Sequence, residues 1–311
     1  MSKIFITGGA GFIGREVAKE LIRRKHKVIS FDLMRANMLE GSKRYSFYVG
    51  SILDPYQLSK AMRNCDYVLH LAAALGVQRT EINRLECMFI NIQGTVNVLD
   101  SCIKEKIKKI IFVSSSEVYG ESGREFIDEN TPLNPKSNYA ISKIAGEEYL
   151  RAYYDTYGLK YNIVRLFNIY GERQREDFVI PKFVKNIMQN KPPVVYGRGD
   201  QIRCFCYVKD AAIGIVDALF SRLEKQTFNI GNDTEPTSIK DLANKVISVS
   251  KKRLKPKFIS YSDSDRDLER DIIRRVPSVE KARKMLNYKP AVSLEKGITK
   301  IVDFYKNKYK E

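Results

Sequence analysis

The chain has few of the residues that build metal centres and disulfide scaffolds. Among its 311 residues are two histidines, His26 and His70, and neither stands at a spacing typical of metal ligands. Its five cysteines are an odd number and include no CxxC pair. That count favours reduced thiols over a disulfide framework. We therefore expect no metal and no structural disulfide.

Long apolar runs are also missing. No stretch of about 18 consecutive apolar residues occurs, so the sequence predicts no transmembrane helix. The most apolar segment, AAIGIVDALF at 211–220, is short and contains Asp217. The N-terminal segment has no basic stretch followed by a long apolar run and a cleavage site, so it does not resemble a signal peptide. We expect a cytosolic protein that does not associate with membranes.

The charge is unbalanced, with 54 Lys and Arg against 37 Asp and Glu and a formal net charge of +17. Such an excess is compatible with nucleic acid, an anionic surface or phosphorylated ligands as partners. The basic residues lie in separate clusters, at 23–25, 104–109 and 251–257, as on solvated helix faces. No zinc finger or aromatic RNA-binding motif accompanies them. We expect nucleic acid not to be the partner.

Short apolar runs alternate with amphipathic stretches through the first half of the chain. The runs that we interpret as strands are 3–7, 27–32, 45–50, 66–72, 109–113 and 161–166. The longest amphipathic stretches between them are 85–106 and 138–157. This alternation predicts an α/β fold with a doubly wound parallel sheet of the Rossmann type.

The pattern loosens after residue 167, where turns multiply and helices interleave with short strands. We predict two domains, a dinucleotide-binding domain at 1–167 and a smaller mixed α/β domain at 168–311. A helix at 209–221 and a short strand near 227–230 are expected to return to the first domain. The boundary is therefore not expected to be a single crossing of the chain.

A glycine-rich motif, ITGGAGFIG at 6–14, follows the first strand and opens the first helix. Gly8, Gly11 and Gly14 provide a tight turn, close approach to a pyrophosphate and close helix–strand packing. The helix N-terminus adds free amides and a positive dipole end. Asp32 ends the second strand, where a carboxylate can accept hydrogen bonds from the ribose hydroxyls and would repel a 2′-phosphate. Together they predict a dinucleotide site that prefers NAD to NADP.

A second motif, SSSEVYG at 114–120, stands at the end of a buried strand, where open parallel sheets bind their ligands. Downstream, Tyr139 and Lys143 are four residues apart in a helical pattern and so share one face. A lysine ammonium near a tyrosine lowers the pKa of the phenol, which can then act as a base. The same spacing recurs at Tyr56 and Lys60, where we expect only a surface helix.

Several motifs in this order resemble one family over nearly the whole chain. They are TGGAGFIG (7–14), HLAA (70–73), NIQGTVNVL (91–99), SSSEVYG (114–120), the Tyr139 and Lys143 pair, VRLFNIYG (164–171), GRGDQIRCFCYVKD (197–210) and YKPAVSLEKGI (288–298). The chain resembles the extended short-chain dehydrogenase/reductase family, in its NAD-dependent nucleotide-sugar epimerase/dehydratase branch.

The resemblance implies a reaction and the residues that carry it. Ser115 matches the catalytic hydroxyl, Tyr139 the general base and Lys143 its electrostatic partner. The implied first step removes a proton from the sugar 4-hydroxyl while a hydride leaves C4 for NAD, which gives a 4-keto sugar. A homodimer formed through the helices at 85–106 and 138–157 is also implied.

The resemblance further implies contacts with both ligands. The implied cofactor contacts, besides Gly8, Gly11, Gly14, Asp32, Tyr139 and Lys143, are Phe12, Ile13, Ser51, Ile52, Leu71, Ala72, Ala73, Asn91 and Ser114. Ser51 departs from the family, which commonly has Asp there. The implied contacts with the nucleotide-diphosphate sugar are Asn168, Val179, Arg203 and either Arg270 or Arg274. An arginine guanidinium also suits phosphate on physical grounds.

Glu117 bears on the fate of the sugar after oxidation. A 4-epimerase is our first interpretation, although Ser-Ser-Glu looks more like uronate decarboxylases and some 4,6-dehydratases, in which such a glutamate could move the C5 proton. Ser116 stands where many dehydratases have Asp. Glu117 could instead be a hydrogen-bond acceptor that orients its neighbours, and the enzyme could stop at the keto sugar. Arg79 and Arg84 could recognise an acidic sugar or be solvated. A non-catalytic NAD-binding or nucleic-acid-binding protein is the competing class.

Overall fold

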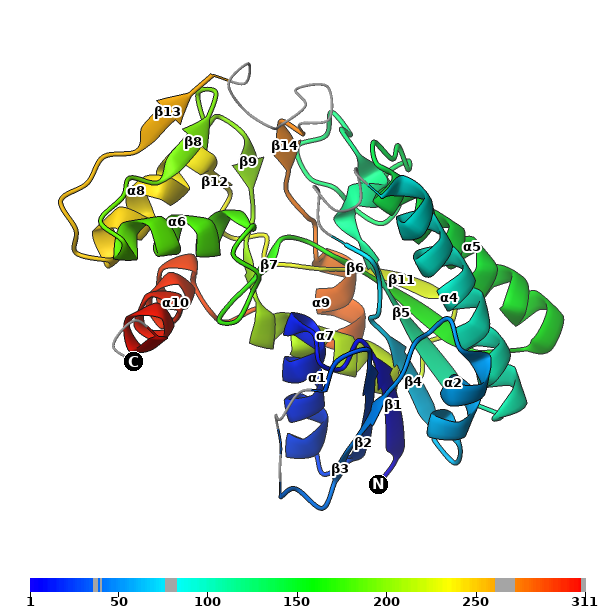
Figure 1. Cartoon of the computed structure of the whole chain (residues 1–311). Coiled ribbons are helices and arrows are strands. Elements are labelled where there is room, and N and C mark those ends of the chain that lie inside the picture. The colour runs from blue at the N-terminus through cyan, green and yellow to red at the C-terminus, as the bar shows by residue number, and fades with distance from the viewer. Residues whose placement is uncertain (36–38, 40, 76–82, 261–271, 309–311) are drawn as a thin grey trace.

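The computed structural model describes residues 1–35, 39, 41–75, 83–260 and 272–308. Seven strands form its main sheet: β1 (Lys3–Thr7), β2 (Lys27–Asp32), β3 (Tyr45–Val49), β4 (Tyr67–His70), β5 (Lys109–Ser115), β6 (Tyr161–Leu166) and β11 (Gln226–Ile230). The strands are ordered β11-β6-β5-β4-β1-β2-β3, and every neighbouring pair is parallel (Figure 1). The predicted fold class is confirmed.

The strands are apolar on both sides because helices cover both faces of the sheet. In β1, Phe5 packs in one core cluster, whereas Ile4 and Ile6 pack in another on the opposite face. In β5, Phe112 and Ile111 divide in the same way. This alternation decides which helix each side chain at the strand ends can reach.

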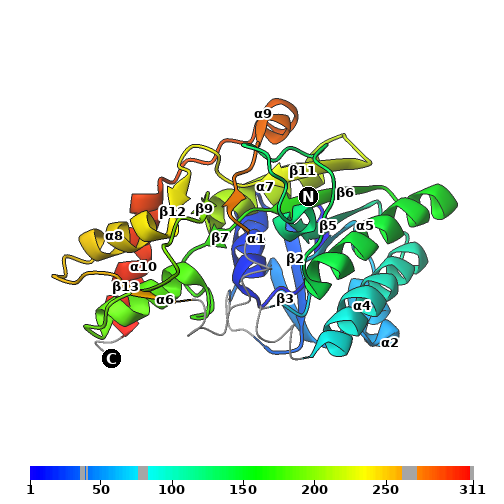
Figure 2. The same ribbon diagram turned by 90° about the horizontal axis from the view of Figure 1, so that it is seen from above.

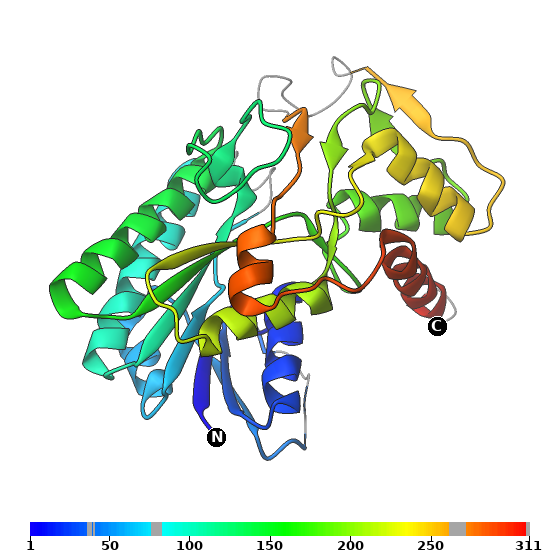
Figure 3. The ribbon, with the colours of Figure 1, turned by 180° about the vertical axis from the view of Figure 1, so that it is seen from behind.

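Different helices cover the two faces of the sheet (Figures 1 and 3). One face carries α2 (Pro55–Met62), α4 (Arg84–Lys104) and α5 (Asn138–Tyr157). The other carries α1 (Phe12–Arg23), α7 (Val208–Phe220) and α9 (Glu280–Leu286). Across the described ranges, no helix is long and apolar enough to cross a membrane.

A second lobe stands beside the sheet (Figures 1 and 2). Its helices are α6 (Val179–Met188), α8 (Ile239–Val249) and α10 (Leu294–Lys308). Its short strands are β8 (Val194–Tyr196), β9 (Ile202–Arg203), β12 (Thr237–Ser238), β13 (Lys257–Ile259) and β14 (Arg274–Arg275), and β7 (Ile169–Tyr170) pairs with β10 (Cys206–Tyr207) between the lobes. The larger core cluster runs from the sheet through α7 into these helices.

The chain passes between the two lobes more than once. After the first part of the second lobe, α7 packs against α1 and β11 joins the edge of the sheet beside β6, with Phe228 opposite Val164. The division into 1–167 and 168–311 is not tested by these contacts and stays a prediction.

Because the sheet is parallel, the carboxyl ends of its central strands meet at one edge. Thr7, Asp32, His70 and Ser115 are the last residues of β1, β2, β4 and β5. A short 3₁₀ helix, η1 (Ser116–Tyr119), continues directly from β5. The polar side chains that the sequence places at strand ends therefore lie along the same edge.

Candidate active site

The turn after β1 is packed so closely that glycine is required at two positions. Gly8 has a φ of +73°, and its amide donates to the carbonyl of Phe31 at 2.9 Å. A Cβ at Gly8 would lie 2.8 Å from the amide nitrogen of Ala72, and one at Gly14 would lie 2.2 Å from the carbonyl oxygen of Gly8. Gly11 begins α1 without a side-chain cap. The turn therefore offers helix amides to an anion, as pyrophosphate sites do.

The carboxylate of Asp32 lies against this turn. Its Oδ2 accepts the amide of Ala10 at 3.0 Å, and its Oδ1 accepts the amide of Leu33 at 2.8 Å. Each carboxylate oxygen can accept a further bond, so Asp32 can fix the turn and still hold ribose hydroxyls. Phe12 and Ile13 form the half-buried first turn of α1.

Further predicted cofactor contacts follow β3 and β4 on the same edge. They are Ser51, Ile52, Leu71, Ala72 and Ala73. The hydroxyl of Ser51 accepts the amide of Leu53 at 3.1 Å. Ile52 is buried against α4, where a Cβ at Gly94 would approach its Cδ1 to 2.4 Å. Ser51 therefore shapes a turn here, in the place where the family commonly has a carboxylate.

Asn91 connects the loop after β4 to α5. Its Oδ1 accepts the amide of Ala74 at 2.7 Å, and its Nδ2 donates to the carbonyl of Ala74 at 3.1 Å and to Oγ of Ser142 at 3.0 Å. The Ser142 hydroxyl in turn donates to the carbonyl of Tyr139 at 2.7 Å. A predicted cofactor contact thus also holds the helical turn that carries the predicted base.

Ser115, Tyr139 and Lys143 come together at the end of β5. The phenol of Tyr139 lies near the hydroxyl of Ser115, which lowers the pKa of the phenol. Nζ of Lys143 donates to the carbonyl of Val113 at 2.9 Å and lies 5.7 Å from the centroid of the Tyr139 ring. By contrast, Tyr56 is 74% exposed on the surface of α2, as expected for the second motif of this spacing.

Burial dominates the ionisation of Tyr139. It raises the pKa of the phenol well above its ordinary value, and the nearby carboxylate of Glu117 raises the pKa further, while the hydroxyl of Ser115 lowers it. The lowered phenol pKa expected from the spacing of Tyr139 and Lys143 is not found, and Lys143 is not among the groups that shift this pKa. Its ammonium is directed to a carbonyl of β5.

Lys143 is 3% exposed, and burial lowers its pKa to about 8. The carboxylate of Glu147, one turn further along α5, raises the pKa in opposition to burial, as does Cys87. The side chain is therefore predominantly an ammonium at neutral pH. It can act as the electrostatic partner that the sequence predicts.

Glu117 occupies the first turn of η1, beside the N-terminus of α5. Its amide donates to Oγ of Ser115 at 3.2 Å, and its Oε2 accepts the hydroxyl of Ser137 at 3.2 Å. The same Ser137 hydroxyl accepts the amide of Ala140 as the N-cap of α5. A half-buried carboxylate therefore stands next to the Ser115 and Tyr139 pair.

The residues expected to hold the nucleotide-sugar lie on the second lobe and the segment that leads to it. Asn168 has a φ of +43°, and its Nδ2 donates to the carbonyl of Cys204 at 2.9 Å. Val179 is the first residue of α6. Arg203 lies in β9, and its Nη1 donates to the carbonyl of Ile202 at 2.9 Å.

Two adjacent arginines of β14 point to different partners. Nε of Arg274 donates to the carbonyl of Glu125 at 3.0 Å, whereas Nη1 of Arg275 lies 3.4 Å from Oγ of Ser116 in the catalytic motif. Arg275, which the sequence prediction missed, is therefore the member of this pair that approaches the site. Arg270 lies outside the described residues.

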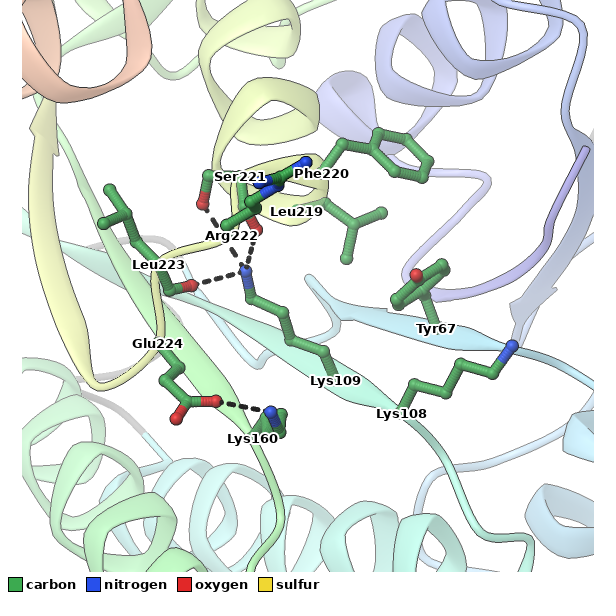
Figure 4. Close-up of a pocket in the computed structure, with 10 residues that line it drawn as sticks. All are labelled: Tyr67, Lys108, Lys109, Lys160, Leu219, Phe220, Ser221, Arg222, Leu223 and Glu224. Atoms are coloured by element: carbon green, nitrogen blue, oxygen red, sulfur yellow. Dashed lines mark hydrogen bonds and ion pairs between the residues drawn. The ribbon is translucent and has the colours of Figure 1, made fainter.

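A pocket of about 520 Å³ lies at the amino ends of β5 and β6, on the edge opposite to this site (Figure 4). Lys109 is one of its lining residues and is 6% exposed. Its Nζ donates to the carbonyl oxygens of Ala218, Ser221 and Leu223 at 3.1, 3.0 and 2.7 Å. Lys109 thus closes the carboxyl end of α7, and the pocket is not part of the candidate active site.

Comparison with known proteins agrees with this geometry. The model of the NAD dependent epimerase/dehydratase family matches residues 4–231. A UDP-N-acetyl-alpha-D-glucosaminuronate decarboxylase of Bacillus cytotoxicus is 34% identical over 320 residues, which cover 98% of each chain. The chain belongs to the NAD dependent epimerase/dehydratase family.

Solved structures of the family superpose closely on the chain. A UDP-glucose 4-epimerase of Thermotoga maritima with UDP-glucose has a TM-score of 0.91 at 29% identity and covers 99% of both chains. A UDP-glucuronic acid 4-epimerase of Bacillus cereus, in complex with UDP-glucuronic acid and NAD, has a TM-score of 0.91 at 30% identity and covers 99% of this chain and all of that one. The chain is therefore an NAD-dependent enzyme with an epimerase/dehydratase fold.

The residues present fit NAD. Gly8 and Gly14 allow a close turn in which a Cβ would collide with backbone, the turn exposes the first amides of α1, and Asp32 stands beside it with free acceptor capacity. When bound, NAD supplies the hydride acceptor and the positive charge of its oxidised ring. The chain's own contribution is a phenol at Tyr139 and an ammonium at Lys143 on the same edge.

The sequence prediction also missed the polar groups buried beneath the site. His70 lies between Thr7 and Thr95, at 2.7 and 3.0 Å. Glu147, which is fully buried, pairs with Arg165 of β6 at 2.5 Å. The signal for them is a charged or polar residue inside an otherwise apolar strand or helix face, because such a residue needs a partner when buried.

Proposed function

We propose that the chain is a 4-epimerase of a nucleotide-diphosphate sugar and that the reaction passes through a transient 4-keto sugar. The grouping of Tyr139, Ser115 and Lys143 at the end of β5, with the ammonium of Lys143 5.7 Å from the centroid of the Tyr139 ring, is the observation that carries this proposal. A phenol, a hydroxyl and a fixed positive charge are what the oxidation of a secondary alcohol needs from the protein.

Each side chain then has one task. Tyr139 takes the proton of the C4 hydroxyl as the hydride leaves, and it returns that proton when the ketone is reduced from the other face. Ser115 donates to the same sugar oxygen and so fixes its position. Lys143 stabilises the phenolate form of Tyr139 by its charge. Lys143 is buried and Ser115 and Tyr139 are partly buried, which limits the access of water to the ketone.

In this proposal, the second lobe binds the nucleotide part of the substrate. The family resemblance assigns contacts with the diphosphate to Arg203 in β9 and to Asn168, and Val179, at the start of α6, is a further expected contact with the nucleotide-sugar. Two solved relatives bind UDP-glucose and UDP-glucuronic acid, which supports this assignment. The net charge of +17 suits a dianionic ligand. The division into a domain for NAD at 1–167 and one for the nucleotide-sugar at 168–311 is part of the proposal.

Decarboxylation of a nucleotide-linked uronate is the second candidate. Glu117 stands beside Tyr139, and Arg275 approaches the neighbouring Ser116, so a carboxylate and a guanidinium both border the sugar site. An arginine can bind a uronate carboxylate. Once C4 is a ketone, the bond from C5 to the carboxyl carbon can break with loss of carbon dioxide, and a protonated glutamate can deliver a proton to C5. A 4,6-dehydratase is less well supported, because Ser116 stands where many of those enzymes have Asp. An enzyme that stops at the keto sugar is a further outcome of the same chemistry.

The experiment is to incubate the NAD-loaded protein in D₂O with UDP-, GDP-, dTDP- and CDP-sugars, neutral and acidic, and to analyse the products by NMR. Inversion at C4 without deuterium at C5 supports the 4-epimerase. Release of carbon dioxide from a uronate, with deuterium at C5, supports the decarboxylase. Turnover of none of these sugars would refute both.

Glu117→Gln tests the role of that carboxylate in the same assay. If Glu117 only orients its neighbours, the variant keeps the product and loses a modest part of the rate. If Glu117 moves the C5 proton, deuterium incorporation at C5 is lost. Glu125→Gln removes an exposed carboxylate from the same connecting loop and is the matched control.

We also propose that the protein forms a homodimer through α4 and α5. Both helices carry apolar side chains on their outer side, among them Leu85 at 88%, Phe89 at 58% and Ile141 at 43% exposure. Exposed apolar side chains on two adjacent helices favour a protein partner. A second copy of this chain offers the same surface, so the contact can close with two-fold symmetry. The cytosolic location stays a prediction.

A further inference from the structure

Helix α5 makes polar contacts with strand β5 at three positions. Three successive turns of α5 each make one polar contact with β5: Tyr139 with the hydroxyl of Ser115, Lys143 with the carbonyl of Val113, and Glu147 with the hydroxyl of Ser114. Residues four apart share a helix face, so the three form one stripe. Two of the three contacts involve the proposed base and its partner. The third, at 2.6 Å, lies beneath them and has no place in the proposed chemistry.

Close packing prevents this face of α5 from shifting against β5. Gly146, which precedes Glu147, lies on the ring of Phe112 in β5, and a Cβ there would come within 2.4 Å of the ring. The backbone of α5 therefore touches the strand at this level. A hydrogen bond at such a point fixes how far the helix can slide along the strand.

Glu147 is itself held firmly. It is fully buried, and Arg165 of β6, which is 3% exposed, donates to its two oxygens from Nε at 2.9 Å and from Nη2 at 2.5 Å. Arg165 also donates to the hydroxyl of Tyr119 at 2.9 Å. A bidentate pair of this kind fixes orientation as well as charge. Ser114 of β5 is thus connected to α5 through Glu147 and to β6 through Arg165.

The same network continues toward the second lobe. The hydroxyl of Tyr119 donates to Oδ1 of Asn229 at 2.8 Å, and Nδ2 of Asn229 donates to the carbonyl of Ile127 at 3.0 Å. The amide of Ile127 donates to the carbonyl of Val276 at 2.9 Å, directly after β14. The strand whose Arg275 approaches the catalytic motif is therefore connected to the helix of Tyr139 and Lys143 through buried polar groups.

We propose that Glu147 is a positioning residue that sets the register of α5 against β5, so that Tyr139 and Lys143 stand opposite Ser115. The inference rests on the proposed function, because it assigns Glu147 to the same oxidation. Glu147 touches neither ligand in this assignment. It acts through Ser114 on the strand and through its charge on Lys143.

Its effect on Lys143 can be separated from its effect on register. The ionisable groups around the ammonium are Glu147 and Tyr139 on α5, Cys87 on α4 and His70 on β4, with Arg165 behind Glu147. Glu147 is the principal group that opposes the burial of the ammonium. Its removal therefore makes Lys143 lose its proton at a lower pH, whereas the removal of the Ser114 hydroxyl alone does not.

Ser114→Ala tests the register. It deletes the contact and leaves the ion pair intact, so we expect kcat to fall about ten-fold at nearly constant KM, as misplacement of reacting groups does. The alkaline limb of the pH–rate profile stays where it is. Ser101→Ala deletes another buried hydroxyl, bonded to the carbonyl of Asn97 on α4, and is the control. If Ser114→Ala keeps full kcat, or if both variants lose activity in proportion to lost thermal stability, the proposal is wrong.

Glu147→Gln combined with Arg165→Met tests the charge without leaving a buried guanidinium unpaired. The double variant is expected to lose kcat and to move the alkaline limb to lower pH, because Lys143 loses its neighbouring carboxylate. Ser114→Ala, measured in parallel, should not move the limb. An unchanged limb in the double variant contradicts this part of the proposal.

Hydrogen exchange of the protein without ligand distinguishes failure of this inference from failure of the proposed function. Faster amide exchange confined to residues 138–157 and 109–115 in Ser114→Ala, but not in Ser101→Ala, supports the register role even if no nucleotide-sugar is turned over. If Ser114→Ala speeds amide exchange throughout the protein, or does not speed it anywhere, the register role is overturned even when the enzyme is active. Absence of turnover in the wild-type protein refutes the proposed function alone.

Discussion

The hydroxyl of Thr7 lies 2.7 Å from Nδ1 of His70, at the carboxyl ends of two neighbouring strands. On the other side of the ring, Nε2 lies 3.0 Å from Oγ1 of Thr95, whose hydroxyl donates to the carbonyl of Asn91 at 2.6 Å. Thr95 therefore accepts from Nε2–H, and Nδ1 accepts from Thr7. His70 is a neutral ring that holds β1, β4 and α4 together beneath the NAD site.

This arrangement predicts a loss of stability in acid. Burial lowers the pKa of His70 from 6.5 to about 3, with the charge of Lys143 as a smaller cause. Between pH values of about 3 and 6.5, His70 is therefore protonated in the unfolded chain and neutral in the folded chain. The stabilisation is complete above about pH 6.5 and is lost as the pH falls toward about 3. At pH 5 the loss amounts to about 2 kcal/mol.

Urea unfolding at pH 7 and pH 5 measures this effect. The wild-type protein should lose more stability between the two values than His70→Gln does, by about 2 kcal/mol. His26→Gln, at a partly exposed histidine, is the control and should change the difference less. Equal pH dependence in wild type and His70→Gln would show that His70 is not held neutral.

Asp32→Asn should weaken NAD binding. The single oxygen of the asparagine can still accept the Ala10 amide but not the Leu33 amide as well, and the charge that we expect to bind ribose hydroxyls and repel a 2′-phosphate is gone. We expect the Kd for NAD to rise about ten- to hundred-fold, because one charged hydrogen bond is worth about 1.5–3 kcal/mol, and we expect the preference over NADP to shrink. Calorimetric titration with both nucleotides tests this. An unchanged ratio of the two affinities would remove Asp32 from the ribose site.

Sequence patterns were sufficient where local geometry dictates the residue. The glycines of the first turn, the strand-ending Asp32 and the bounds of α5 follow from backbone demands and hydrophobic period, and the structure has them where they were predicted. Arg274 and Arg275 show the limit. Adjacent residues of a strand face opposite ways, so one position decides which guanidinium reaches Ser116.

The effects of burial between elements could not be predicted from the sequence. The spacing of Tyr139 and Lys143 suggested a lowered phenol pKa, but burial and the nearby carboxylate of Glu117 raise it. The pairing of Glu147 with Arg165 joins a helix to a strand that follows it, and no local pattern specifies that contact. Effects that depend on packing between elements therefore needed the structure.

Lys109→Met should destabilise the fold strongly. Its buried ammonium donates to the carbonyl of Ala218 in the last turn of α7 and to those of Ser221 and Leu223 beyond it, and the variant leaves these acceptors without the charged donor. Figure 4 shows the contacts with Ser221 and Leu223. We expect a loss of about 2–4 kcal/mol in the free energy of unfolding. Lys108→Met, at the adjacent exposed lysine paired with Asp66, should cost much less. Similar losses for both lysines would contradict the role of Lys109.

Phe89→Lys should convert the proposed homodimer to a monomer. Phe89 is 58% exposed on α4, and a charge there would be buried against the second copy. Sedimentation velocity of wild type and variant measures the change. Phe258→Lys, at a 47% exposed aromatic of the second lobe, is the control and should leave the dimer intact. A wild-type monomer, or a Phe89→Lys dimer, would refute this interface.

The central claim is that Tyr139 serves a transient oxidation of a nucleotide-sugar, and rapid-mixing absorbance of the NAD-loaded protein tests it most directly. With the sugars that are turned over, the wild-type protein should show reduced nicotinamide formed and then consumed. Tyr139→Phe should bind the same sugar with similar affinity and form reduced nicotinamide about 10²–10⁴-fold more slowly, the usual share of a general base. Equal rates in wild type and Tyr139→Phe would contradict the account.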